Sequence, residues 1–393
     1  MDFVSKVLNE KEKGIQLRLP DFGLRNLRVL VRVDYNVPLD SQGFIVNDRR
    51  IRLSLDTIRF LVEQNCKVIL MSHLGSPKGR VFSKLKMDKV ASRLSELLSR
   101  PVKKLDDCIG EEVKKTVLDM NPREIIMLEN LRFHEEEELN DPFFAKELAS
   151  LGEVYVNDAF GTCHREHAST IGVTKYLPSF AGFLLKKEVD MLSRILEPEH
   201  PFVVLLGGAK VSDKIMLIDN LLEKADKILI GGAMMFTFLK SQGLEVGKSL
   251  VEDDRLKTAQ DLLRHGKIYL PSDVKCDTGE KDVDKMKPDD TGLDIGEKTI
   301  NDYKELLSSA KTIFWNGPLG KFEDPKYANG TVEIAKFIST LRATTVVGGG
   351  DSAEAIENLG LVDKFTHVST GGGASLEFIQ NGTLPCIEPL RKR

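Results

Sequence analysis

Short apolar runs alternate with amphipathic stretches along the whole chain. Apolar runs occupy residues 26–36, 67–75, 124–133 and 153–160 in the first half, and 201–208, 227–233, 267–274, 312–318, 344–350 and 365–373 in the second. Between them, stretches such as IRLSLDTIRFLVEQ and VASRLSELLSR repeat their apolar residues with a helical period. Nearly continuous apolar strands that alternate with helices are typical of parallel sheets covered on both faces. The pattern therefore predicts an α/β protein with two doubly wound parallel sheets.

The stretch LPSFAGFLLKKEVDMLSRILEPEHP, residues 177–201, separates the two halves. Its apolar residues follow a helical pattern, and Pro198 and Pro201 end that pattern because proline cannot continue a helix. We therefore expect an N-terminal domain over residues 1–176, a connecting helix in 177–201 and a C-terminal domain over 202–377. A chain of 393 residues is also too long for one ordinary hydrophobic core, which favours two domains.

Composition narrows the class of protein. The net charge of −4 argues against a general nucleic-acid binder, since such domains are strongly basic. The five cysteines never form a CxxC pair, which disfavours a disulfide framework or a zinc ribbon and favours a reducing compartment. The first residues do not resemble a signal peptide, and no uncharged run approaches the ~18 residues of a membrane span. We expect a soluble, cytoplasmic protein with neither nucleic acid nor membrane as a partner.

Polar motifs follow directly after the apolar runs. In open α/β sheets, ligands bind beyond the carboxyl ends of the strands, so this placement favours binding sites. The first half presents side chains suited to a small anion, namely Arg32, Asp34, Asn36, His73, Arg132, Asp158, Arg165 and His167. The second half presents glycines, at 207–208, 231–232, 348–350 and 371–373. Their bare backbone N–H groups are suited to phosphates.

The loops GGGDSAEAI (348–356) and STGGGASLEF (369–378) each follow a strand and open a helix. One such loop is explained as well by a tight turn that needs positive φ, but two in consecutive strand–helix units favour a phosphate site. Asp351 suits either an N-cap or a Mg²⁺ ligand. In GGAKVSDK, Lys210 and Lys214 lie four residues apart on an incipient helix, hence on one face, and we expect them to face a phosphate.

Two motif-like stretches are excluded, and one stays open. GGGDSA matches a dinucleotide-binding pattern but lacks the acidic residue ~20 positions on, where Thr370 stands. GLEVGKS has three residues between its glycines, whereas a Walker A loop has four. Glu323, in WNGPLGKFED, suits ribose hydroxyls or a turn equally well.

The stretch VNDAFGTCHREHAST, residues 156–170, admits three kinds of site beside a simple polar loop. Cys163 with a neighbouring histidine suggests a nucleophile and its base, but adjacent loop positions rarely hold that geometry. Cys163, His164 and His167 suggest a metal site, yet a fourth ligand and a suitable spacing are missing. An anion site is favoured because Arg165 does not stand alone. Arg50, His73 and Arg132 also follow strands of the same half, and such a cluster is costly unless an anion neutralises it.

Eleven motifs together resemble the phosphoglycerate kinase family. They are RVDYNVPLD, NDRRI, MSHLGSPKG, LENLRF, VNDAFGTCHREHAST, LGGAKVSDKI, GGAMMFTFL, GLDIG, WNGPLGKFE, GGGDS and STGGGASLEF. They run in order from residue 32 to residue 378. The resemblance implies two similar-sized Rossmann-like domains joined by a hinge helix, with a C-terminal segment, residues 378–393, that folds back toward the first domain. Any one motif is weak, whereas eleven in register are highly specific.

The resemblance also implies ligands and the residues that hold them. It implies 3-phosphoglycerate or 1,3-bisphosphoglycerate on the N-terminal domain, held by Asp34, Asn36, Arg50, His73, Arg132 and Arg165. It implies Mg-bound ATP or ADP on the C-terminal domain, held by Lys210, Lys214, Gly231, Gly232, Gly292, Asn316, Glu323, Gly349, Gly350, Asp351 and Ser352. Asp351 is the implied Mg²⁺ ligand. The implied catalytic groups are Arg50, Lys210, Lys214, Gly371, Gly372 and Gly373, and the family is usually monomeric.

One position departs from the family pattern. The family usually reads HLGRP, whereas this chain has Ser76 at the position of the arginine that contacts the substrate phosphate. One guanidinium is therefore missing from the anion site, and we expect weaker substrate binding unless Lys78 or Arg80 replaces it. Cys163 stands where alanine is usual, which disfavours catalysis by its thiol.

The implied reaction explains why no general base is evident. A carboxylate acceptor is already ionised at pH 7, since carboxylates titrate near pH ~4. Direct in-line transfer then depends on positioning and on stabilising charge at the moving phosphoryl group. Substrates held on different domains require closure about residues 177–201. Two alternatives stay open: another nucleotide-dependent carboxylate or phosphate kinase, and a nucleotide-binding protein that has lost turnover.

Overall fold

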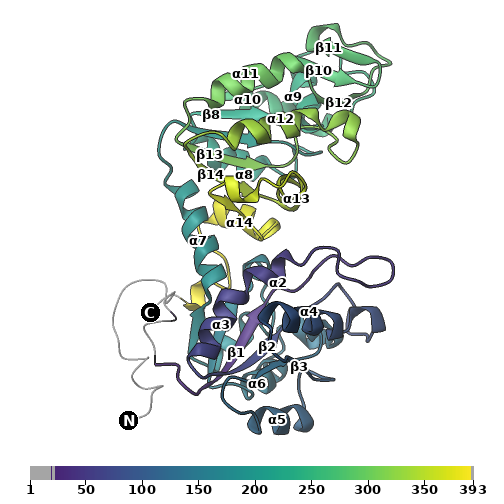
Figure 1. The fold of residues 1–393 in the computed structure, drawn as a ribbon. Helices are drawn as coiled ribbons and strands as arrows, with labels where there is room; N and C mark the ends of the chain where they lie inside the picture. Colours follow the sequence, from purple (N-terminus) through teal and green to yellow (C-terminus); the bar gives the residue numbers. More distant parts are fainter. Residues whose placement is uncertain (1–18, 20–22, 391–393) are drawn as a thin grey trace. The chain divides into compact units, whose positions relative to one another are not determined.

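A computed structural model of the chain describes residue 19 and residues 23–390 (Figure 1). The chain divides into two compact units, with unit 1 reaching Val189 and resuming at Thr383, and unit 2 spanning Asp190–Gly382. The division falls inside helix α7 (Phe183–Leu196). The predicted domain boundaries differ from this division by several residues and stay predictions.

Unit 1 contains a six-stranded sheet in the order β3-β4-β2-β1-β5-β6, and all of its strand pairs are parallel. Its strands are β1 (Arg28–Val33), β2 (Lys67–Met71), β3 (Lys103–Lys104), β4 (Ile125–Met127), β5 (Val154–Asp158) and β6 (Ser179–Ala181). Its helices before α7 are α2 (Arg49–Leu53), α3 (Leu55–Glu63), α4 (Asp88–Leu98), α5 (Glu111–Leu118) and α6 (Pro142–Ala149).

Alternation along β1 explains why both faces of this sheet are covered. Val29, Val31 and Val33 belong to the hydrophobic cluster that includes the buried sides of α3 and α4. Leu30 belongs to a second cluster, with the buried sides of α5 and α6. Successive side chains of a strand point to opposite faces, so each cluster fills one side of the sheet.

Unit 2 contains a second six-stranded parallel sheet, in the order β15-β14-β13-β7-β8-β9. Its strands are β7 (Phe202–Leu206), β8 (Lys227–Ile230), β9 (Ile268–Tyr269), β13 (Thr312–Asn316), β14 (Thr344–Gly348) and β15 (His367–Val368). Its helices after α7 are α8 (Ile215–Leu222), α9 (Met234–Ser241), α10 (Leu256–Leu263), α11 (Glu297–Leu307), α12 (Asn329–Ile338), α13 (Gly350–Asn358) and α14 (Gly373–Asn381). The predicted fold class, two parallel sheets flanked by helices, is confirmed.

Three details differ from the predicted elements. The predicted helix at 51–64 is two helices, α2 and α3, which meet at Ser54. The stretch 177–201 begins with the short strand β6, so its helix is only α7. Unit 2 also carries a small antiparallel sheet in the order β11-β10-β12, formed by β10 (Asp273–Cys276), β11 (Gly279–Asp282) and β12 (Gly292–Ile295).

Candidate active site

The predicted anion-binding residues of unit 1 follow four neighbouring strands, β4, β2, β1 and β5. Asp34 and Asn36 follow β1, His73 follows β2, Arg132 lies in a 3₁₀ turn after β4, and Arg165 follows β5. Because these strands are parallel, their carboxyl ends meet at one edge of the sheet. The sheet order thus carries residues from distant parts of the sequence to the same edge.

Arg32, the fifth residue of β1, is fully buried beneath this edge. Its Nε donates to Ser169 Oγ at 2.8 Å, and its Nη1 donates to the carbonyl of Val33 at 2.5 Å. Its Nη2 lies 3.1 Å from His73 Nδ1. Ser169 Oγ in turn donates to Glu137, another fully buried side chain, at 2.5 Å. Arg32 therefore forms the floor of the cationic cluster, with its donors satisfied inside the protein.

Arg32 was expected at the anion site from its position near a strand end, but the family resemblance did not name it among the ligand-binding residues. It interrupts the apolar run RVLVRV, where a charged residue on a two-sided buried strand is costly unless it is paired. Its partners Ser169 and Glu137 lie in separate loops, so spacing alone does not reveal the chain of hydrogen bonds.

Asp34, Arg50, His73 and Asn36 lie together, as predicted. Arg50 Nη1 donates to Asp34 Oδ2, and His73 Nδ1 lies 4.0 Å from Asp34 Oδ1. Asn36 Oδ1 accepts from the backbone N–H of Gly75 at 2.8 Å, which ties the loop after β1 to the loop after β2. Arg50 is one-third exposed, so its guanidinium reaches solvent while it is held by the carboxylate.

Arg132 and Arg165 extend the cluster. Arg132 is nearly buried, its Nη1 donates to the carbonyl of Gly75 at 2.9 Å, and its Nε lies 3.1 Å from Glu138 Oε1. Arg165 is exposed, and its Nε lies 3.1 Å from His164 Nε2. Burial lowers the pKa of Arg132 most, and the charge of Arg165 lowers it further. The two guanidinium groups are therefore close enough to repel each other.

The pKa values of two histidines, His73 and His167, reflect the positive charges of these arginines. Burial, followed by the charges of Arg32 and Arg132, holds the pKa of His73 well below its ordinary value. Burial and the same two arginines, joined by Arg165, lower the pKa of His167 to about 3. Both imidazoles are therefore neutral at pH 7, and the arginines alone supply the positive charge that an anion would neutralise.

The geometry excludes the two other interpretations of residues 156–170. Cys163 is fully buried, and its Sγ lies 3.5 Å from the carbonyl of Ala159. Burial raises the pKa of the Cys163 thiol well above its ordinary value, the opposite of what a nucleophile needs. Within the described part of the chain, the potential metal-binding cluster does not include Cys163, His164 or His167.

Ser76 is exposed, as are Lys78 and Arg80, the two candidates to replace the missing arginine. A surface pocket of about 450 Å³ lies beside Ser76, lined by Ser76, Pro77, Phe82, Ser83, Lys84 and Leu85. Lys84 Nζ donates to the carbonyl of Ser41 at 3.0 Å, so its ammonium group is bound to the backbone as well as to solvent.

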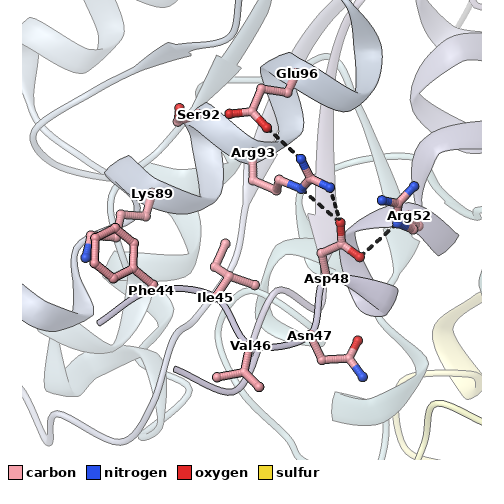
Figure 2. A pocket seen from close by; sticks show the side chains of 10 residues that line it. All are labelled: Phe44, Ile45, Val46, Asn47, Asp48, Arg52, Lys89, Ser92, Arg93 and Glu96. Atoms are coloured by element: carbon pink, nitrogen blue, oxygen red, sulfur yellow. Dashed lines mark hydrogen bonds and ion pairs between the residues drawn. The ribbon is translucent and has the colours of Figure 1, made fainter. Parts of the chain in front are cut away.

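A second pocket, of about 690 Å³, is lined by residues of α2, α4 and the 44–48 loop (Figure 2). Arg93 contacts Asp48 at 2.8 Å and Glu96 at 2.6 Å, and Arg52 contacts Asp48 at 2.8 Å. Charges paired in this way leave little net field. The network instead joins the start of α2, the helix that carries Arg50, to α4.

The glycine loops of unit 2 likewise follow neighbouring parallel strands. Gly207 and Gly208 follow β7, Gly231 and Gly232 follow β8, Asn316 ends β13, and the two triplets lead from β14 into α13 and from β15 into α14. Gly349 is the N-cap of α13 and Gly372 is the N-cap of α14, with φ of 93° and 51°. The first N–H groups of both helices lack intrahelical acceptors, as a phosphate site requires.

Lys214 lies beside Asn316 and the loop before α13. Its Nζ donates to Asn316 Oδ1, and Asn316 Nδ2 donates to the carbonyl of Gly348 at 2.8 Å. Burial lowers the pKa of Lys214 to about 8, while the nearby carboxylates of Asp213 and Asp351 raise it. The structure thus brings Lys214 and Asn316 together, with the carboxylate of Asp351 near enough to act on Lys214.

Ser352 and Gly349 complete this corner. Ser352 Oγ accepts from the N–H of Gly317 at 3.1 Å and donates to the carbonyl of Gly348 at 2.7 Å. A Cβ at Gly349 would lie 2.5 Å from Asn316 Nδ2, so only glycine fits this approach. In the second loop, Gly371 N–H donates to Ser369 Oγ at 3.0 Å, whereas Gly373 begins α14.

Close packing also explains the other predicted glycines. A Cβ at Gly231 would lie 2.7 Å from a side-chain atom of Leu319, and one at Gly292 would lie 2.0 Å from the ring of Phe236. Gly232 has a φ of 62° and would meet backbone atoms. These constraints account for glycine at each position without a ligand, so they neither favour nor oppose an adenine site.

The remaining predicted residues, Lys210, Asp351 and Glu323, have exposed side chains. The expectation that Lys210 and Lys214 share a helical face is wrong, because α8 begins only at Ile215. Residues 207–214 form an irregular loop and turn, since two glycines there favour non-helical backbone. Lys214 is half-buried while Lys210 extends to solvent.

Two parallel α/β sheets, one edged by arginines and one by glycine loops and a lysine, are suited to an enzyme that binds phosphate groups. The family model described as "Phosphoglycerate kinase" matches residues 19–382. The chain belongs to the phosphoglycerate kinase family, and it is therefore a kinase of glycolysis with small-molecule substrates.

Individual relatives agree with this assignment. The chain is 55% identical over 392 residues to a phosphoglycerate kinase of Dictyoglomus turgidum, covering 96% of this chain and 98% of that protein. It is 51% identical to one of Coprothermobacter proteolyticus, covering 94% and 97%. Among solved structures, a phosphoglycerate kinase of Coxiella burnetii matches with a TM-score of 0.85 at 38% identity, covering 95% of this chain and 98% of that one.

Among the helices formed by residue 19 and residues 23–390, each is too short or too polar to cross a bilayer.

Proposed function

We propose that the protein catalyses direct, reversible in-line phosphoryl transfer between the acyl phosphate of 1,3-bisphosphoglycerate and Mg-ADP. The products are 3-phosphoglycerate and Mg-ATP. The observation that carries this proposal is the cluster of arginines, Arg32, Arg50, Arg132 and Arg165, around two neutral histidines. A cluster of guanidinium groups at one sheet edge is suited to a small, highly charged anion.

Within this proposal, unit 1 binds the phosphoglycerate. Arg132 and Arg165 contact its phosphate, while Asp34 and Asn36 contact its hydroxyl and carboxylate, directly or through water. Arg50 approaches the transferring group, since it is already held at the sheet edge by Asp34. His73 is neutral and serves as a hydrogen-bonding group rather than as a cation.

Unit 2 binds the nucleotide in the same proposal. Lys214 is the phosphate-contacting cation closest to the glycine loops, and Lys210 is a second, solvent-exposed one. The N–H groups at the start of α13 and α14 contact phosphate oxygens, with Gly371, Gly372 and Gly373 beside the group in transfer. Gly231, Gly232 and Gly292 line the adenine site, and Glu323 contacts ribose.

The residues near α13 fit a Mg²⁺ ion. Asp351 is exposed and close enough to Lys214 to raise the pKa of that lysine. One carboxylate together with substrate phosphates is the usual donor set for Mg²⁺. When bound, the ion would neutralise charge on the nucleotide phosphates, and Asp351 would orient it.

No residue needs to act as a general base in this reaction. The acceptor carboxylate is ionised at pH 7, so the protein has to bind, orient and exclude water. Arg50, Lys214, Lys210 and the glycine N–H groups stabilise the transferring phosphoryl charge. Because the two sets of residues belong to different units, we include hinge-bending closure about α7 in the proposal. We also propose that the protein is a monomer and that it acts in the cytoplasm.

The test is release of ADP from Mg-ATP by the purified protein, with 3-phosphoglycerate, with glycerate or without an acceptor. We expect release only with 3-phosphoglycerate, because the arginine cluster requires the phosphate. Release with glycerate at a similar rate would indicate a different carboxylate kinase. Binding of ATP in calorimetry without release under any condition would indicate a nucleotide-binding protein that has lost turnover.

A further inference from the structure

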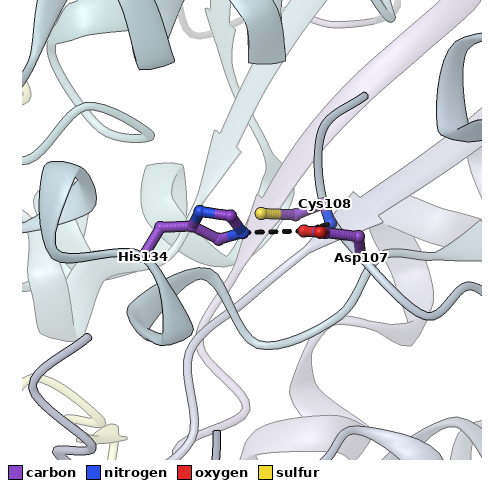
Figure 3. A group of neighbouring side chains, drawn as sticks. All are labelled: Asp107, Cys108 and His134. Atoms are coloured by element: carbon purple, nitrogen blue, oxygen red, sulfur yellow. Dashed lines mark hydrogen bonds and ion pairs between the residues drawn. The ribbon is translucent and has the colours of Figure 1, made fainter. Parts of the chain in front are cut away.

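Asp107, Cys108 and His134 form a compact cluster in unit 1 that the phosphoryl-transfer mechanism does not use (Figure 3). Asp107 and Cys108 follow β3, and His134 follows the turn after β4. These two strands are parallel neighbours, so the loops after them leave the sheet at the same edge. Figure 3 shows the three side chains pointing toward one another.

The three donor atoms have the separations that a metal ion needs. The imidazole nitrogen, the thiol sulfur and a carboxylate oxygen all lie within 4.8 Å of one another. In a tetrahedral zinc site with bonds of about 2.0 Å to nitrogen or oxygen and about 2.3 Å to sulfur, donor atoms are about 3.3–3.6 Å apart. His134 Nε2 and Asp107 Oδ1 are now 2.7 Å apart, so a small side-chain rotation would admit the ion.

Burial differs among the three residues in a way that suits an open site. Cys108 is fully buried, whereas His134 is 27% exposed and Asp107 is 52% exposed. The sulfur thus closes the site from inside, and solvent can reach the other two ligands. A water molecule can occupy the fourth position, as in zinc sites with three protein ligands.

The cluster is also distinct from an ordinary surface ion pair. An aspartate–histidine pair needs no thiol, and a buried cysteine usually serves only as a small apolar residue. Here the thiol of Cys108 borders the polar pair rather than apolar groups alone. Nitrogen, sulfur and oxygen donors together favour zinc over magnesium or calcium, which prefer oxygen alone.

We propose that Asp107, Cys108 and His134 bind a thiophilic divalent cation, Zn²⁺ foremost, in an open tetrahedral site with water as the fourth ligand. The sulfur–hydrogen bond of Cys108 breaks as the metal–sulfur bond forms, and its proton leaves to solvent, as does any proton carried by His134 Nε2. No electron is transferred. The bound ion joins the loop before α5 to the turn that carries Arg132, and it therefore stabilises unit 1.

Cobalt titration of the metal-free, full-length protein tests the site. We expect one equivalent of Co²⁺ to give a near-ultraviolet sulfur-to-cobalt charge-transfer band and intense tetrahedral bands in the visible. One equivalent of Zn²⁺ should abolish both. Cys108→Ser should abolish the charge-transfer band, whereas Cys276→Ser, a buried cysteine of unit 2, should leave it unchanged. Co²⁺ bound at Asp351 would have oxygen ligands and give no such band.

A second variant, His134→Gln, tests the same site if Cys108→Ser fails to fold. His134→Gln keeps the buried thiol and changes a partly exposed side chain. We expect it to weaken cobalt affinity by at least the roughly 10- to 100-fold that loss of an outer-shell partner costs. Zn²⁺ should raise the thermal midpoint of the wild type but not of His134→Gln. No charge-transfer band in the wild type, an unchanged band in Cys108→Ser, or an unchanged cobalt affinity in His134→Gln would overturn the proposal.

Discussion

At the scale of a single residue, Arg32 shows how a buried side chain holds the residues of a binding surface in place. Its guanidinium is fully buried, contacts Ser169 and His73, and lies in the same field as the buried Glu137. Removing one member of such a network leaves the others buried without compensation, which costs more than the network contributes when intact. A residue of this kind stabilises the fold and sets the charge of the site at once.

We therefore predict that Arg32→Met lowers the free energy of unfolding of unit 1 by about 3 kcal/mol. Arg28→Met is a matched control, since Arg28 lies on the same strand and makes only a partly exposed ion pair with Glu153 at 3.4 Å. Its loss should stay below about 1 kcal/mol. Urea unfolding of both variants measures the difference, and equal losses would show that the buried network has no special role.

His167 predicts a dependence of stability on pH. Its pKa is about 3 in the folded protein, below the ordinary value of 6.5, because burial and the neighbouring arginines disfavour its charged form. Below about pH 6.5 the unfolded chain binds a proton that the folded protein does not, so stability falls as pH falls toward 3, by up to ~1.4 kcal/mol per pH unit. His73 acts in the same direction.

His167→Asn removes one of these two contributions. Its unfolding free energy, measured in urea at several pH values between about 7 and 5, should fall less steeply with decreasing pH than that of the wild type. The neighbouring Glu137 is present in both proteins, so its titration cancels in the comparison. Parallel curves for the two proteins would contradict the assigned pKa of His167.

At the scale of secondary-structure elements, two neighbouring glycines at the start of α13, Gly349 and Gly350, differ in how tightly the backbone constrains them. Gly349 has a φ of 93°, and a Cβ there would lie 2.5 Å from Asn316 Nδ2. Gly350, the next residue, has open space around its Cα and no left-handed φ. Both are proposed to bind the nucleotide through backbone N–H groups, which alanine retains.

Gly349→Ala should therefore raise the KM for Mg-ATP and destabilise unit 2 by about 1–3 kcal/mol, the usual cost of such backbone strain. Gly350→Ala should change the KM for Mg-ATP by less than about twofold, since neither φ nor space opposes the methyl group. Steady-state kinetics and urea unfolding of the two variants give the answer. A larger effect of Gly350→Ala would contradict a purely backbone role for this loop.

The same scale explains what the sequence could predict and what it could not. The apolar strands, such as β7, were predictable because a two-sided buried strand has almost no polar positions. The break between α2 and α3 at Ser54 and the loop at 210–214 were not, because both stretches keep a helical apolar period while tertiary contacts decide the backbone. The strand order, which brings Arg132 and Arg165 to one edge, comes from pairing that a single sequence does not reveal.

The site was predictable to a similar degree. Asp34 and His73 were identified from strand-end positions and family motifs. Arg50 was expected just after a strand but lies in α2, and the structure still brings it to Asp34. Arg32 was expected at the anion site, but its buried chain of hydrogen bonds was not predicted, because its partners Ser169 and Glu137 are far away in sequence. Asp107 and Cys108 lie in a different loop from His134, so only the folded chain shows that the three residues meet.

At the scale of the whole molecule, the proposal requires motion. Residues proposed to bind phosphoglycerate belong to unit 1, and those proposed to bind nucleotide belong to unit 2. Closure would exclude water that otherwise hydrolyses ATP. We expect it only when both ligands are present, since each alone contacts one unit.

Small-angle X-ray scattering tests this expectation. The radius of gyration should decrease with 3-phosphoglycerate and Mg-ATP analogue together, and it should change little with either ligand alone. Identical scattering profiles for the ligand-free and doubly liganded protein would contradict the hinge-bending part of the proposal.

The measurement that tests the central claim most directly is isothermal titration calorimetry of the wild type, Arg165→Ala and Lys214→Ala with each ligand. Arg165→Ala should weaken 3-phosphoglycerate binding by about tenfold or more, as expected for a lost charge-assisted contact, and leave Mg-ATP binding unchanged. Lys214→Ala should do the reverse. If one variant lost binding of both ligands, or if Arg165→Ala lost Mg-ATP binding, the claim that the two ligands bind to separate units would be contradicted.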